Sequence, residues 1–130
     1  MTSGFFATQC AVTEEEGVLI TALGADPIAG QEQYLMLQHC DEYSEQDVEL
    51  GMDRVHIEYC GQGWSWYGHI DRAELTRNQL RLQMSQAAAA RMGNDGRIEV
   101  GFAIDDGLFE SLRRALRRTF QDQSWYVELD

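Results

Sequence analysis

The sequence predicts an α+β fold, in which a mainly antiparallel, curved sheet of about six to seven strands carries a C-terminal amphipathic helix on one face. Two observations lead to this prediction. Short stretches of alternating apolar and polar residues are joined by polar turns rather than helical crossovers, which favours antiparallel pairing. One later stretch, from Leu108 to Phe120, repeats its apolar residues at helical spacing.

The first half of the chain contains only predicted strands and turns. Gln33–Gln38 is almost continuously apolar, which is typical of a strand in the middle of a sheet or buried on both faces. Gly61-Gln62-Gly63 separates two alternating stretches, so these two form a hairpin. Gly24 to Pro27 is expected to end the second strand. The predicted strands are Phe5–Val12, Val18–Leu23, Gln33–Gln38, Arg54–Tyr59 and Trp64–Ile70.

The second half adds strands over 80–84 and 97–104, a strand extension over 73–75, and two helices. Four consecutive alanines predict a short helix over Gln86–Met92 that Gly93 ends. The amphipathic helix begins after a cap at Asp105 or Asp106, and a short strand or tail follows from Ser124 to Leu129. A pleckstrin-like barrel has the same order of elements, several strands followed by one helix, and it is therefore the alternative fold.

The length of 130 residues predicts one domain over residues 1–130. No stretch of about 18 apolar residues and no secretory signal is found, so we expect no membrane association. The three cysteines, Cys10, Cys40 and Cys60, are odd in number and far apart, which favours reduced thiols in a cytoplasmic protein.

Acidic residues outnumber basic ones by 22 to 10, which gives a net charge of −12. The excess lies in residues 1–60, where 12 acids accompany a single base, Arg54. An acidic field repels nucleic acid and anionic lipid and attracts basic proteins, so we expect a protein partner and no nucleic acid or membrane. The arginines at 113, 114, 117 and 118 are interpreted as a solvated helix end that complements the helix dipole.

No motif predicts catalysis, a metal or a cofactor, so we expect the protein not to be an enzyme. His39 and Cys40 are neighbours on a predicted strand and point to opposite faces, and no C-x-x-C pair is present. The G-x-S-x-G and calcium-loop patterns are also missing. Trp64 and Trp66 share a face and are expected in the core, which leaves Tyr67 to face outward.

The order of several short motifs resembles the immunity protein 10 family of bacterial polymorphic toxin systems. The motifs run from Gln33 to Phe120 and include Tyr34-Leu35-Met36-Leu37-Gln38, Val55-His56-Ile57-Glu58, Ser65-Trp66-Tyr67-Gly68-His69-Ile70, Ile98-Glu99-Val100-Gly101-Phe102 and Phe109-Glu110-Ser111-Leu112. The resemblance implies a cytoplasmic protein, encoded beside a toxin, that binds and neutralises that toxin. It implies no catalytic residue.

The toxin-binding hypothesis assigns the densest acidic stretch, together with one exposed aromatic anchor, to contact with a basic toxin surface. The predicted toxin-binding residues are Asp41, Glu42, Glu45, Asp47, Glu49, Asp53 and Tyr67. Two alternatives stay open. One is a small hydrolase or ligand-binding domain with a pocket around His56 and Glu58. The other is a homodimeric adaptor that pairs through a sheet edge or the Trp66–Tyr67 surface.

Overall fold

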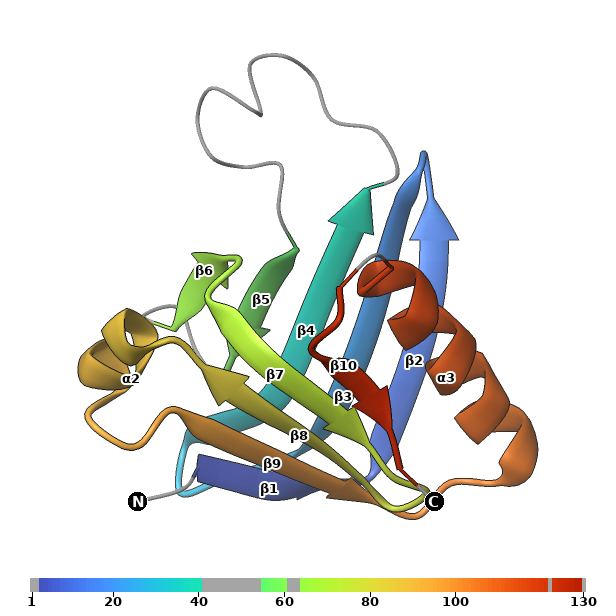
Figure 1. Cartoon of the computed structure of the whole chain (residues 1–130). Coiled ribbons are helices and arrows are strands. Elements are labelled where there is room, and N and C mark those ends of the chain that lie inside the picture. The colour runs from blue at the N-terminus through green and yellow to red at the C-terminus, as the bar shows by residue number, and fades with distance from the viewer. Residues whose placement is uncertain (1–2, 41–54, 61–63, 122, 130) are drawn as a thin grey trace.

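The computed structural model describes residues 3–40, 55–60, 64–121 and 123–129, and these residues form ten strands and two helices (Figure 1). The elements are β1 (Ser3–Ala7), β2 (Gln9–Glu15), β3 (Val18–Ile28), β4 (Gln31–Cys40), β5 (His56–Tyr59), β6 (Ser65–Tyr67), β7 (Ile70–Leu75), β8 (Gln79–Met84), α2 (Gln86–Met92), β9 (Arg97–Phe102), α3 (Asp106–Thr119) and β10 (Tyr126–Glu128).

The strands form two sheets of five, and alternate residues of both sheets meet in one apolar core. Sheet A has the order β1-β9-β8-β7-β10, and sheet B has the order β2-β3-β4-β5-β6. Leu23 and Leu37 of sheet B, Leu82 and Val100 of sheet A, and Leu116 of α3 belong to the same buried cluster. In Figure 1, α3 lies beside β10, in front of sheet B and on the same side of it as sheet A.

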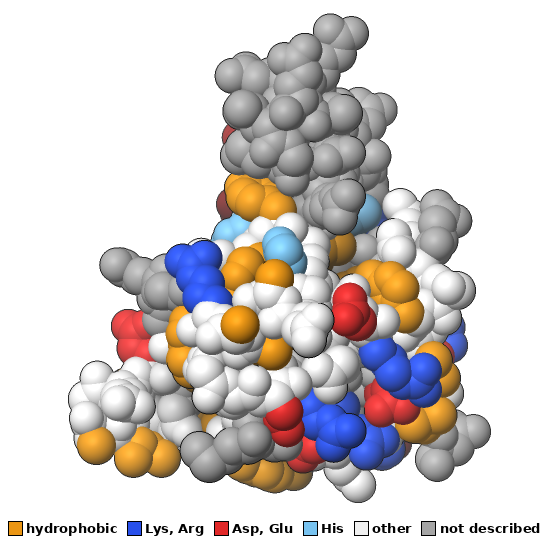
Figure 2. Space-filling view, turned by 60° about the vertical axis from the view of Figure 1, so that its left-hand side comes forward, with side chains coloured by type: hydrophobic (Ala, Val, Ile, Leu, Met, Phe, Trp, Pro, Cys, Tyr) orange, Lys and Arg blue, Asp and Glu red, His pale blue; other side chains and the backbone are white. Residues whose placement is uncertain are grey.

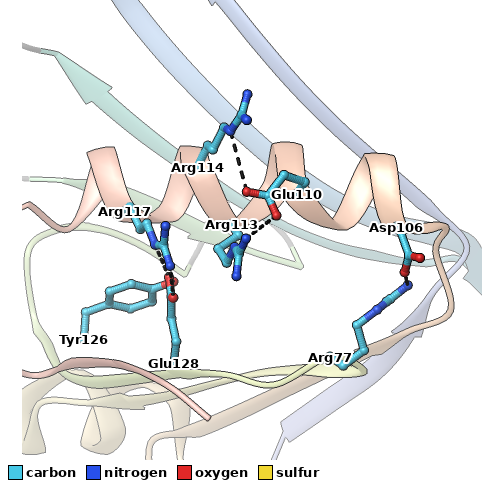
Figure 3. Close-up of polar contacts among 8 residues, drawn as sticks. All are labelled: Arg77, Asp106, Glu110, Arg113, Arg114, Arg117, Tyr126 and Glu128. Atoms are coloured by element: carbon cyan, nitrogen blue, oxygen red, sulfur yellow. Dashed lines mark hydrogen bonds and ion pairs between the residues drawn. The ribbon is translucent and has the colours of Figure 1, made fainter. Parts of the chain in front are cut away.

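The amphipathic helix α3 forms as its sequence pattern predicts. The Asp105 carboxylate caps it by accepting a hydrogen bond of 2.8 Å from the Leu108 backbone N–H. Leu112, Leu116 and Phe120 are almost fully buried, which fixes the apolar face of the helix in the core. On its outer side, Arg117 makes two hydrogen bonds to Glu128 of β10 (Figure 3).

Two further local predictions are confirmed. The alanine run forms α2, and Gly93 ends it in the left-handed conformation with a φ of 74°. Strands β5 and β6 pair antiparallel, with Ile57 opposite Trp66. The side chains of Ile57 and Trp66 face the core, as the alternation predicted.

The fold class is confirmed only broadly, because the numbers of sheets and strands differ from the prediction. Ten strands in two open sheets replace one sheet of six to seven strands, and the pleckstrin-like barrel is not the arrangement found. Strand β10 follows α3, within the range predicted for a short final strand or tail. Most pairs are antiparallel, but β1 pairs with β9 and β10 pairs with β7 in parallel. Residues distant in sequence make these two pairs, and turn patterns report only on neighbouring strands.

Several predicted strand boundaries are wrong. The stretch Trp64–Ile70 divides after Tyr67, because Gly68 and His69 take left-handed backbone and Ile70 begins β7 of sheet A. The stretch Phe5–Val12 divides at Thr8, where the chain passes from sheet A to sheet B and the Thr8 N–H donates to the Gly24 carbonyl at 2.8 Å. The second strand does not end at Gly24 but continues to Ile28. Pro27 is tolerated because the β3–β4 register shifts between Ala25 and Ile28, and a β-bulge is one of the places where a strand accommodates proline.

Candidate partner-binding face

The side of sheet B that faces away from the core carries two rows of side chains that cross all five strands. We call these two rows the open face of sheet B. The first row consists of Thr13, Ile20, Gln38, His56 and Tyr67, and the second of Ala11, Ala22, Met36, Glu58 and Ser65.

None of the side chains of the open face is buried, whereas their neighbours along each strand, such as Leu19, Leu37 and Ile57, are. Ile20, Ala22 and Met36 therefore place apolar surface in the middle of the sheet without full cover. An uncovered apolar area bordered by polar groups is typical of a protein–protein contact surface. Gln33–Gln38 lies in the middle of the sheet as predicted, but it is not buried on both faces.

Tyr67 lies at the β6 end of this face, as the strand alternation predicted. Its side chain is 39% exposed, while Trp66, which points the other way, is only 8% exposed. The Tyr67 ring contacts the His56 ring, with 4.8 Å between the centroids. Because this contact restricts the ring, Tyr67 presents a large amphipathic surface that loses little side-chain freedom on binding.

Glu58 lies near the middle of the open face and accepts a hydrogen bond from the Tyr34 hydroxyl, which comes from β4. His56 is its neighbour on the same face of β5. The pocket hypothesis requires these two groups to converge in a cavity. They instead lie on an open sheet face, and they line neither of the two grooves found among the described residues.

Charge is divided between the two sheets. The described residues between Gln9 and Tyr67 include six acids (Glu14, Glu15, Glu16, Asp26, Glu32 and Glu58) and no Lys or Arg. The nine described arginines all lie between Arg72 and Arg118, in sheet A and the helices, with eight acids around them. In the view of Figure 2, most of the Arg side chains lie against Asp or Glu. Positive charge is thus balanced locally on that half. Of the six acids of sheet B, Glu14 pairs with Arg118 of α3, and the described residues of the sheet B half supply no base of their own.

The six acids of the predicted binding stretch, Asp41, Glu42, Glu45, Asp47, Glu49 and Asp53, lie outside the described residues. Their contribution to binding therefore stays a prediction. The chain leaves sheet B at Cys40, the end of β4, and returns to it before His56, the start of β5. These strands are neighbours in sheet B, so the acidic stretch is attached to the sheet that carries the open face.

The sequence did not reveal a groove of about 880 Å³ between β1, the β3–β4 hairpin and the end of β5. Phe5, Tyr59 and Trp64 contribute aromatic rings to its wall, and Ile28 lies on its rim with 64% exposure. Sequence reasoning assigned Trp64 to the core and gave Ile28 no role. One feature of the sequence could have indicated that Ile28 is exposed. Ile28 is a lone β-branched residue beside Pro27, in a run of otherwise small and polar residues.

The described part of the chain gives little support for metal binding, reactive cysteines or a membrane-spanning helix. Those residues contain no group of three or more His, Cys, Asp or Glu side chains placed to bind a metal ion. Cys10, Cys40 and Cys60 are half-buried and form no disulfide, and burial raises the pKa of the Cys10 and Cys60 thiols. Neither α2 nor α3 combines the length and apolar character that a membrane crossing requires.

The described residues form a two-sheet fold with an uncovered, partly apolar sheet face, which is the kind of surface that the class of protein-binding domains uses. Within this class, the family model for immunity protein 10 matches residues 6–110, so the chain belongs to the immunity protein 10 family and is an immunity protein against a toxin. The match begins earlier than the resemblance noted over 33–120 and includes β2 and β3. No curated protein and no solved structure matches the chain.

Proposed function

We propose that this immunity protein binds its toxin through the open face of sheet B and neutralises it by occlusion, covering a basic active-site surface. The observation that carries the proposal is the division of charge, because the described residues from Gln9 to Tyr67 include six acids and no base. Long-range attraction speeds the encounter with a basic partner, and apolar groups in the middle of the contact then hold the complex.

The size of the open face fits such a contact. The five strands contain 35 residues, which is seven per strand on average. With about 3.3 Å per residue and about 4.8 Å between strands, the sheet measures on the order of 500 Å². A partner in a stable complex commonly buries about 800 Å². The sheet therefore supplies most of a contact surface, and the attached acidic stretch extends it.

Occlusion needs no catalytic group in the immunity protein, so we propose that it acts by binding and is not an enzyme. We also propose that the two proteins meet in the cytoplasm. The support for this location is that no disulfide joins Cys10, Cys40 and Cys60, as is usual in a reducing compartment.

The test uses the toxin domain encoded in the neighbouring reading frame, with Tyr67→Ala as the variant. Truncation of an exposed aromatic anchor is expected to weaken binding by about tenfold or more, with no change in protein stability. Titration calorimetry gives the Kd, and the toxin's own activity gives the inhibition. Leu129→Ala is the matched control, because Leu129 is 37% exposed, close to the 39% of Tyr67, but lies beside β7 of sheet A. Equal affinity for Tyr67→Ala and the wild type would show that the open face is not the contact surface.

A further inference from the structure

The groove beside β1 has a wall of stacked aromatic rings. The Phe5 and Tyr59 rings lie 6.3 Å apart at 30°, and the Tyr59 and Trp64 rings lie 5.7 Å apart at 5°. Tyr59 is almost fully buried, while Phe5 and Trp64 are half-buried. The stack therefore forms a rigid apolar surface, of the kind that holds an apolar or flat side chain.

The same groove borders an unpaired strand edge. Strand β1 is the outermost strand of sheet A, and β9 pairs with it on one side only. Among the described residues, no strand pairs with its other edge. In an extended strand the backbone groups point alternately to the two sides, so part of β1 presents donors and acceptors away from β9. Gly4 and Phe5 of this strand line the groove.

The close pairing of β1 with β9 depends on Gly4. A Cβ atom at that position would lie 2.1 Å from the Glu99 carbonyl oxygen. Because the glycine lets the two strands approach, β1 is held firmly along β9 and its other edge stays at the groove. In Figure 1, the turn between β3 and β4 lies close to the start of β1, and residues of both line the groove.

The side chains that line the groove indicate which kind of chain segment fits it. Of the described residues that line it, Glu32 alone is charged, and Ile28 adds exposed apolar surface on the rim. No cation lies among them. A chain segment that places an Arg or Lys near Glu32 and an apolar side chain against the aromatic stack would satisfy both features, and Trp64 adds the option of a cation–π contact.

We propose that this groove binds an extended basic and apolar segment of the toxin, which pairs with the free edge of β1 as an added strand. This inference rests on the proposed function and deepens it by a second contact, separate from the open face. Backbone pairing with β1 gives affinity for any extended segment, while the aromatic stack, Ile28 and Glu32 select its side chains.

Amide hydrogen exchange of the full chain, alone and with the toxin domain, tests the pairing. The proposal expects protection of residues 3–7 and 28–33 in the complex, because added strand pairing removes β1 amides from water. If the toxin domain binds but these two segments exchange as in the free protein, the groove proposal is overturned and the open-face proposal stands. If the wild type does not bind the toxin domain at all, both are overturned.

A pair of variants tests the side-chain selection. Ile28→Arg places a cation in the path of a basic segment and is expected to weaken toxin binding by about tenfold or more. Leu129→Arg makes the same charge change at an exposed apolar side chain that lies outside both the groove and β1, and it should bind like the wild type. Equal effects of the two variants would overturn the proposal. So would a wild-type dimer in light scattering that Ile28→Arg dissociates, because a second copy would then be the occupant.

Discussion

At the scale of single residues, several tight turns use left-handed backbone at positions that are not glycine. Glu16 and Gly17 connect β2 to β3 with φ values of 51° and 82°, and Ala29 and Gly30 connect β3 to β4 with 52° and 77°. Two positive φ values in succession are the requirement of a type I′ hairpin turn. Alanine gives no sequence signal for such a turn. This is why the end of β3 was expected at Gly24–Pro27 instead.

The residue-scale prediction concerns the strain at Ala29. Left-handed backbone costs a residue with a Cβ about 1–2 kcal/mol, and the greater freedom of glycine in the unfolded chain offsets about 0.4–1 kcal/mol of this. Ala29→Gly is therefore expected to raise the free energy of unfolding by about 0.5–1 kcal/mol, measured by urea denaturation. Ala22→Gly, within β3, is the matched control and should lower it. A destabilised Ala29→Gly would contradict the strained turn.

At the scale of elements, the sequence predicted those features that depend on a pattern of neighbouring residues. Helix α3 was predictable because its cap at Asp105 and its apolar stripe are both local patterns. The open face was not. Val18, Ile20 and Ala22 are as apolar as Leu19 and Leu23 on the other side of β3, so alternation alone cannot tell which side lacks cover. Tyr67 was placed correctly because it alternates with a buried tryptophan.

The element-scale prediction concerns the contact between α3 and β10 (Figure 3). Hydrogen bonds from Arg117 at 2.6 and 2.8 Å, with a further one from the Tyr126 hydroxyl, lower the pKa of Glu128 below its ordinary value of 4.5. A lowered pKa in the folded state means that the contact stabilises the protein above pH 4.5 and ceases to do so as the pH falls through the folded-state pKa.

Glu128→Gln is therefore expected to be less stable than the wild type at neutral pH, and the difference should shrink as the pH falls below 4.5 and through the lowered folded-state pKa of Glu128. Denaturant unfolding across this range measures the difference. Arg117→Met and the double variant complete the cycle and isolate the Arg117–Glu128 coupling. A difference between Glu128→Gln and wild type that does not change with pH would contradict the assignment of the shift to this contact.

At the scale of the whole molecule, the uneven distribution of charge along the sequence becomes an uneven distribution of charge over the folded protein. The described acids of the first half lie in sheet B and its turns, and the described arginines lie in sheet A, in the β7–β8 turn and in the helices. Composition already predicted a basic partner, but only the sheet topology relates the acidic half to the open face. The parallel pairs β1–β9 and β7–β10, which close the two edges of sheet A, came from distant segments that no local pattern connects.

The central claim is that the sheet B half, with its acidic stretch, attracts and binds the toxin. Stopped-flow association of the toxin domain tests it, from about 0.01 to about 1 M salt, as the screening length falls from about 30 to about 3 Å. The wild-type on-rate should fall steeply with salt. A triple variant that removes three acidic charges, Glu45→Gln, Asp47→Asn and Glu49→Gln, should bind with an on-rate about tenfold lower at low salt. Its on-rate should also depend less steeply on salt concentration. The control is a second triple variant with the same charge change on the other half of the molecule, Asp71→Asn, Glu99→Gln and Asp106→Asn. This control should leave the on-rate almost unchanged. Equal slowing by the two triple variants, or no slowing by either, would contradict the account.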